Sequence, residues 1–157
     1  MTTADRIYLD NAATSWPKPD AVYDAVDDYQ RRLGAPAGRG AYRAGGEVQR
    51  LVAGCRKTIA DLIGASEPNR IAFAFNGTDA LNIALHGLLR AGDHVVTTVV
   101  EHNSVLRPLK WLKQNRGVSV TRVGCDETGV VHAQQIADAM EGNTRLVALT
   151  HASNVTG

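Results

Sequence analysis

Three short polar segments of this 157-residue chain have the residue types needed to bind a phosphorylated ligand and to move a proton. Asn76-Gly77-Thr78-Asp79 offers a glycine turn and a hydroxyl, Glu101-His102-Asn103-Ser104 offers an imidazole, and residues 151–157 offer the amide of Asn154. Backbone N–H groups at the start of a helix bind anions, above all phosphate. A single histidine at such a place is more often structural than functional, so the chemistry depends on whether the three segments meet.

Each polar segment directly follows an apolar run, and the runs at 71–75, 95–100 and 146–150 predict buried strands. In a parallel sheet the carboxyl ends of the strands lie at one edge, so we expect the three segments to face one crevice. After the first run, apolar residues recur at helical spacing from Leu81 to Leu88, which predicts a helix that begins at the turn. An ordinary strand-to-helix connection, with Gly77 in the turn and Thr78 as the cap, remains an alternative to a phosphate site.

The rest of the chain alternates between helical and strand patterns. Helices are predicted over 20–33, 48–63, 106–115 and 133–140, and further strands over 7–9 and 118–123. Strands that are apolar on both faces, alternating with amphipathic helices, indicate an α/β fold with a mostly parallel sheet and helices on both faces. We expect Cys55 to be a buried structural thiol on the apolar face of its helix and Cys125 to be a small filler residue in a turn.

Composition and charge exclude several classes of function. A formal net charge of +1 argues against nucleic acid and a membrane surface as partners. The two cysteines are not at metal-ligand spacing, and no apolar run approaches the length of a membrane span. The chain shows neither G-x-G-x-x-G after a strand nor a P-loop. We expect a cytoplasmic protein with no metal site.

The three polar segments, together with residues 10–14 (Asp-Asn-Ala-Ala-Thr), occur in the order and approximate spacing of motifs in the class V aminotransferases, and the chain resembles the N-terminal part of these enzymes. Its nearest group within that family is the cysteine desulfurases. The resemblance implies pyridoxal 5'-phosphate (PLP) as cofactor and the type I, aspartate aminotransferase-like fold. It divides the chain into an N-terminal segment and helix, 1–40, and an incomplete PLP-binding large domain, 41–157.

The resemblance assigns cofactor-binding roles to four residues. Gly77 and Thr78 resemble the pair that binds the PLP phosphate, although the family usually has Thr-Thr or Ala-Thr there. A backbone N–H does this work, so the glycine leaves binding intact. His102 resembles the catalytic histidine that stacks on the pyridine ring and assists proton transfer. Asn154 resembles the asparagine that hydrogen-bonds the ring hydroxyl and touches the substrate.

The implied reaction removes sulfur from L-cysteine, leaves alanine and passes a persulfide to a sulfur-acceptor protein. Asn11 and Ala13 resemble the segment that closes over the amino-acid substrate, and the whole enzyme is expected to be a homodimer. Related enzymes of the family with the same motifs act on other amino acids, so a selenocysteine lyase or a kynureninase-like enzyme is the alternative.

The family also needs a Schiff-base lysine, and no lysine of this chain fits that place. The lysines are Lys18, Lys57, Lys110 and Lys113, and none follows a predicted strand at the crevice. We therefore expect the chain to be the N-terminal portion of a longer enzyme and to be inactive alone, without the lysine and the nucleophilic cysteine. Two other readings remain: a non-catalytic, truncated PLP-fold protein that serves as a binding module, and an α/β phosphate-ligand binder unrelated to PLP.

Overall fold

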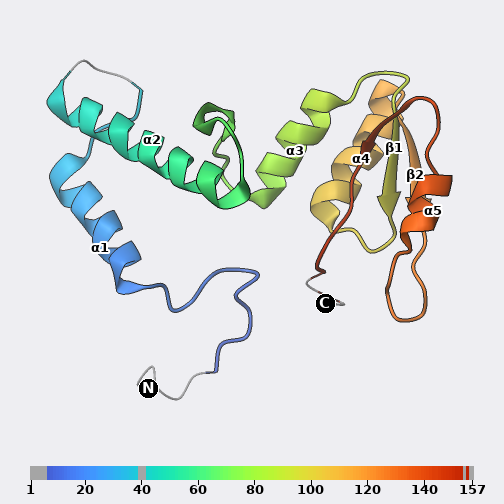
Figure 1. Cartoon of the computed structure of the whole chain (residues 1–157), viewed down its shortest axis with the longest axis horizontal. Helices are drawn as coiled ribbons and strands as arrows, with labels where there is room; N and C mark the ends of the chain where they lie inside the picture. Colours follow the sequence, from blue (N-terminus) through green and yellow to red (C-terminus); the bar gives the residue numbers. More distant parts are fainter. Residues whose placement is uncertain (1–6, 39–41, 154, 156–157) are drawn as a thin grey trace. The chain divides into compact units, whose positions relative to one another are not determined.

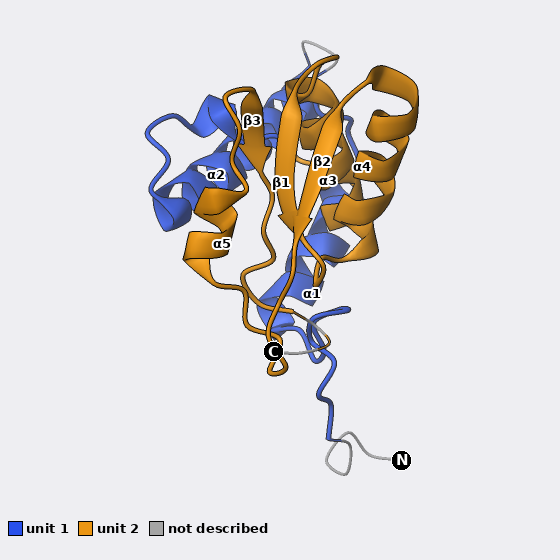
Figure 2. Cartoon of the chain, turned by 90° about the vertical axis from the view of Figure 1, so that its right-hand side faces the viewer, with its two compact units in different colours: residues 1–72 blue, residues 73–157 orange. Residues whose placement is uncertain are grey.

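The computed structural model describes residues 7–38, 42–153 and 155, and these residues form an arrangement of helices and a parallel sheet (Figure 1). The chain divides into two compact units, Met1–Ala72 and Phe73–Gly157, which Figure 2 colours separately. Each unit is described by itself below. The domain boundary predicted between residues 40 and 41 stays a prediction.

The first unit is helical. Helix α1 (Asp20–Asp28) begins right after Pro19 and continues as a π-helical turn, η2 (Tyr29–Leu33). Helix α2 (Arg43–Ile63) is followed by a short 3₁₀ turn, η3 (Pro68–Arg70). Gly34 and Gly64 end η2 and α2 at φ of +51° and +70°, a left-handed conformation that favours glycine. The predicted helices over 20–33 and 48–63 are therefore confirmed.

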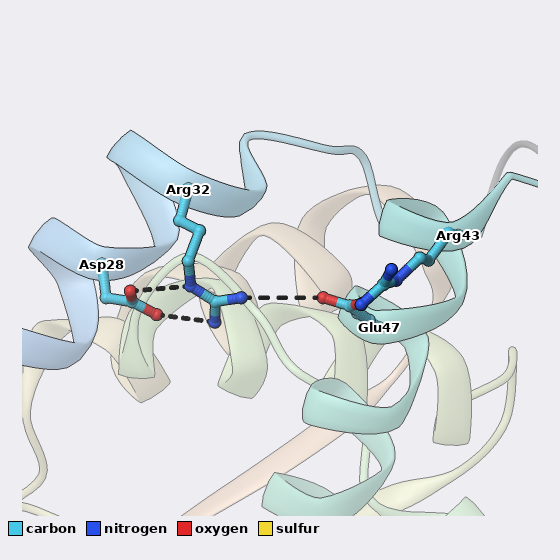
Figure 3. Close-up of polar contacts among 4 residues, drawn as sticks. All are labelled: Asp28, Arg32, Arg43 and Glu47. Atoms are coloured by element: carbon cyan, nitrogen blue, oxygen red, sulfur yellow. Dashed lines mark hydrogen bonds and ion pairs between the residues drawn. The ribbon is translucent and has the colours of Figure 1, made fainter.

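A chain of ion pairs joins η2 to α2 within this unit (Figure 3). The Arg32 guanidinium donates hydrogen bonds of 2.9 and 3.0 Å to the two carboxylate oxygens of Asp28, and it lies 3.9 Å from Glu47. Arg43 donates to Glu47 at 3.0 Å. The hydrogen bond from Arg32 lowers the pKa of Asp28, and the same bond raises the pKa of Arg32. Because Asp28, Arg32 and Arg43 are solvent-exposed and only Glu47 is half-buried, the pairs orient the helix ends more than they stabilise the fold.

The second unit is a three-layer α/β arrangement. Its strands are β1 (His94–Thr98), β2 (Ser119–Val123) and β3 (Thr144–Val147), paired in parallel in the order β2-β1-β3. Its helices are α3 (Gly77–Leu88), α4 (Asn103–Arg116) and α5 (Ala133–Asp138). Helices α4 and α5 cover opposite faces of the strands (Figure 1). The predicted fold class is confirmed, with strands β1 and β3 ending two and three residues earlier than the apolar runs suggested.

Two apolar clusters lie on the two faces of this sheet. On one face Val95 packs with Val118 and with residues of α3 and α4, including Leu85, Leu109 and Leu112. On the other face Val96 packs with Val123 and Ile136. Successive residues of β1 thus point to opposite faces, as the alternation of a strand requires, and both faces are covered.

Two predicted strands are absent from the described part of the chain. Residues 7–9 and 71–75 have no partner in the sheet, and Phe75 is 99% exposed. An apolar run indicates burial, but a strand also needs a neighbouring strand, and neither run pairs with β1, β2 or β3. The strand predictions at 7–9 and 71–75 are therefore wrong for this structure.

The prediction of a buried Cys55 is also wrong. Cys55 is exposed, and Leu51, Leu62 and Ile63 of the same apolar stripe on α2 are more than half exposed. The periodicity identified the helix correctly, and Val48 at the start of the stripe is buried, but no described element buries Cys55 or these three residues. Cys125 is half-buried after β2.

No helix in the described ranges is long and apolar enough to cross a membrane. Within the same residues, no group of three or more histidine, cysteine or acidic side chains could hold a metal ion.

Candidate functional site

The start of α3 presents backbone N–H groups toward solvent. Asn76 is the N-cap, and its Oδ1 accepts a hydrogen bond of 2.9 Å from the N–H of Asp79. The Asp79 carboxylate turns back and accepts from the N–H of Phe75 at 3.1 Å. Gly77 and Thr78 occupy the first two helical positions, whose N–H groups have no acceptor within the helix. This end of α3 can therefore bind an anion through two N–H groups and the Thr78 hydroxyl.

The backbone does not require a glycine at position 77. Its φ is not positive, and a Cβ built on it meets no atom within 4 Å. A larger residue would fit, so the glycine leaves the helix start open without creating strain.

His102 lies at the N-cap of α4 with its ring held in one orientation. Its Nδ1 accepts a hydrogen bond of 3.1 Å from the N–H of Ser104 and lies 2.7 Å from the Ser104 hydroxyl. Because Nδ1 accepts the backbone N–H, the neutral ring carries its proton on Nε2. The imidazole is exposed while Ser104 is buried, so the helix start fixes the ring and leaves Nε2 available.

Helices α3 and α4 bring Thr78 and His102 into one pocket of about 530 Å³. Its other walls are Asn82 and His86 of α3, with Asn103, Ser104, Arg107, Pro108 and Trp111 of α4. The rings of His86 and Trp111 lie 5.2 Å apart at the far end. A phosphate group fits the helix start and the cation of Arg107, and an aromatic ring fits beside the imidazole. The donor set suits a phosphorylated aromatic cofactor.

A second hollow of about 500 Å³ shares His102 and Asn103 with the first. Residues from 99–103 line it on one side, and Thr150, Ala152, Ser153 and Val155 line it on the other. The two hollows together bring the three polar segments to one edge of the sheet, beyond the carboxyl ends of β1 and β3.

The buried side chain of Glu101 connects the segment after β1 to the segment after β3. It is 7% exposed, and its Oε1 accepts hydrogen bonds from the Thr98 hydroxyl (3.0 Å) and the Thr150 N–H (2.6 Å). Its Oε2 accepts from the Thr150 hydroxyl at 2.6 Å. One carboxylate therefore ties the end of β1 to the segment after β3, directly beside His102.

The other predicted site residues, Asn154, Asn11 and Ala13, stay predictions. Asn154 lies outside the described residues. Asn11 and Ala13 belong to the first unit, where the Asn11 side chain accepts from the N–H of Trp16 at 3.1 Å. Of the lysines, Lys110 and Lys113 face a groove beside β2, and neither lines the two hollows.

Sequence reasoning assigned no role to several residues of the site, among them Ser104, Arg107 and Trp111. Ser104, Arg107 and Trp111 recur at three- and four-residue steps along α4, a spacing that places them on one side of a helix starting at His102. That spacing could have identified them once the start of the helix was known. The role of Glu101 had no such signal, because an acid after a strand is typical of any loop.

The model of the family described as Aminotransferase class-V matches residues 7–157. A curated relative from Methanothermobacter thermautotrophicus, named "Probable cysteine desulfurase", is 41% identical over 98% of this chain and 38% of its own length. The solved apo structure of a cysteine desulfurase from Thermococcus onnurineus NA1 is 33% identical with a TM-score of 0.82, over 94% of this chain and 37% of that one. A structure described as SspA in complex with cysteine is 26% identical with a TM-score of 0.80. The match covers 90% of this chain and 41% of that one. The chain thus spans about two fifths of the length of these proteins.

Proposed function

Because the chain belongs to the class V aminotransferase family, whose enzymes depend on PLP, we propose that it supplies the phosphate-binding and ring-covering part of a cysteine desulfurase. The observation that carries this proposal is the pocket where the start of α3 and the N-cap histidine of α4 meet. PLP, when bound, supplies an electron sink for bond cleavage at an amino-acid substrate. The residues of the protein bind the cofactor, orient it and move the proton.

Gly77 and Thr78 bind the phosphate in this proposal. Their N–H groups and the Thr78 hydroxyl donate to phosphate oxygens, and the positive end of the α3 dipole adds to the attraction. Arg107, which lines the same pocket, contributes a positive charge.

His102 covers the cofactor ring and handles a proton at Nε2. Its Nδ1 bond to Ser104 fixes the ring plane, so Nε2 stays aimed in one direction. Asn154 hydrogen-bonds the ring hydroxyl, and Asn11 and Ala13 close over the substrate. These three roles rest on the family motifs alone.

The reaction we propose for the whole protein transfers the sulfur of L-cysteine to an enzyme thiolate, giving alanine and a persulfide that a sulfur-acceptor protein then takes. The whole enzyme acts as a homodimer. No lysine or cysteine is among the described residues that line the two hollows, and this reaction needs both. We therefore expect the 157-residue chain by itself to bind PLP without turnover.

The test uses the protein as its source cell produces it, incubated with PLP and L-cysteine, and measures alanine and persulfide. We expect both products, and we expect His102→Ala to lower the rate by about 10²–10⁴-fold, the usual contribution of a positioned acid or base. His132→Ala, an exposed histidine outside both hollows, is the matched control. Faster release of product from L-selenocysteine or L-kynurenine would reassign the substrate, and PLP binding without product from any of them would indicate a binding module.

Thr78→Ala is expected to weaken PLP binding by about 10- to 100-fold, because a hydrogen bond to a charged group contributes about 1.5–3 kcal/mol. Titration followed by the visible absorption of PLP measures this. Thr58→Ala removes a hydroxyl that, among the described residues, donates to the Gly54 carbonyl of α2, and it should leave the affinity unchanged. Equal PLP affinities of the two variants would show that Thr78 does not bind the phosphate.

A further inference from the structure

The positive charge of this chain is concentrated in one stretch. Residues 103–123, which contain α4 and β2, carry five lysines and arginines and no acid. The other residues carry 12 basic and 16 acidic side chains, so their balance is negative. The net charge of +1 is therefore the sum of a basic segment and a larger part with a negative balance.

Three of these five cations line a groove between α4 and β2. Lys110 and Lys113 come from α4 and Arg122 from β2, and all three side chains are exposed. Leu109 and Val120 line it as well, and the groove has a volume of about 290 Å³. We call this surface the α4–β2 groove. It combines apolar walls with a rim of positive charge.

Some other exposed cations pair with carboxylates, whereas these three have no such partner among the described residues. Arg31, Lys57 and Arg70 pair with carboxylates at 2.7 to 3.2 Å. In the described ranges, no ion pair or side-chain hydrogen bond is recorded for Lys110, Lys113 or Arg122. Three like charges around one groove repel one another, so an anionic ligand would lower their energy.

The groove also lies along an open strand. In the order β2-β1-β3, β2 pairs with β1 on one side only, and its other edge has no partner among the described strands (Figure 2). Val120 and Arg122 are two residues apart, so both lie on the face of β2 that α4 covers. An added strand could therefore bond to the backbone of β2 while its side chains meet the groove.

We infer that the α4–β2 groove docks an acidic, extended segment of a partner protein. The open edge of β2 supplies backbone hydrogen bonds, the half-buried Val120 offers an apolar contact, and the three cations pair with carboxylates. Nucleic acid fits less well, because the groove is short and the rest of the chain has a negative balance that repels a phosphate backbone. None of the groove residues lines the hollows at His102, so docking and cofactor binding are separable.

The test uses the protein as its source cell produces it, loaded with PLP, and a fluorescein-labelled eight-residue peptide that alternates glutamate and valine. Fluorescence anisotropy should show binding that weakens as salt rises. Lys110→Glu, Lys113→Glu and Arg122→Glu combined should lower the affinity at least tenfold. The control combines Arg31→Glu, Lys57→Glu and Arg70→Glu, which changes the net charge equally, and it should stay within twofold. If the first triple variant loses its PLP absorption, the three glutamine replacements take its place and should still lower the affinity.

Three results would overturn the inference. The first is no detectable binding of the peptide to the unmodified protein. The second is equal loss in the control variant, or equal binding of a peptide with glutamine in place of glutamate, because either result means the groove is not the site. The third is tighter binding of a polyuridine strand of the same charge, which would make this face a nucleic-acid surface.

Discussion

Glu101→Ala is expected to lower the free energy of unfolding by about 2–4 kcal/mol, because it leaves the buried Thr98 hydroxyl and the half-buried Thr150 N–H without their acceptor. Urea unfolding followed by circular dichroism measures the change. Glu101→Gln is the matched control: its amide oxygen can take the place of Oε1, and its NH₂ group can donate to the Thr150 hydroxyl. We expect Glu101→Gln to lower the free energy of unfolding clearly less than Glu101→Ala does.

The alanine variant should also affect the site beyond its effect on stability. The Glu101 carboxylate connects the end of β1 to the segment after β3, and His102 follows it directly. Hydrogen exchange at residues 99–103 and 150–153 should therefore accelerate in Glu101→Ala under conditions where the protein remains folded. If alanine and glutamine cost the same, or if exchange changes evenly across α4, the carboxylate does not hold these segments together.

A double-mutant cycle with Thr150→Val separates this connection from simple loss of packing. Thr150→Val removes the hydroxyl that donates to Oε2 and keeps the backbone N–H that donates to Oε1, so the two variants should be non-additive by the contribution of the hydroxyl bond. Additive costs would mean that each residue acts through other neighbours.

The sequence correctly predicted the elements that have a local pattern of apolar residues or a glycine at their end. Apolar residues at three- and four-residue steps identified α2, α3 and α4, and glycines marked the end of η2 at Gly34 and of α2 at Gly64. The strand-end rule held for the segments after β1 and β3, which parallel pairing brings to one edge, whereas the segment 76–79 follows a run that forms no strand. These features depend on local chemistry and on the geometry of any parallel sheet.

The wrong or missing predictions concern strand pairing, burial and long-range hydrogen bonds, which depend on two elements at once. The run 71–75 is apolar enough for a strand, but a strand forms only when it pairs with a neighbour, and this run pairs with none of the described strands. Cys55 lies on a genuine apolar stripe, but no described element covers it. Glu101 and its partners are 3 and 49 residues apart, a connection that no local pattern encodes.

Leu109→Ala is expected to cost about 2–5 kcal/mol of unfolding free energy, the range for truncating a buried leucine. Leu109 is 1% exposed and packs in the cluster between α4 and the sheet. Leu62→Ala is the control: Leu62 also lies on a helix but is 83% exposed, so its loss should stay within about 0.5 kcal/mol. Urea unfolding of both variants gives the comparison. A small cost at Leu109 would contradict the core described for the second unit, whereas a large cost at Leu62 would mean that the apolar stripe of α2 is covered in the protein that the cell makes.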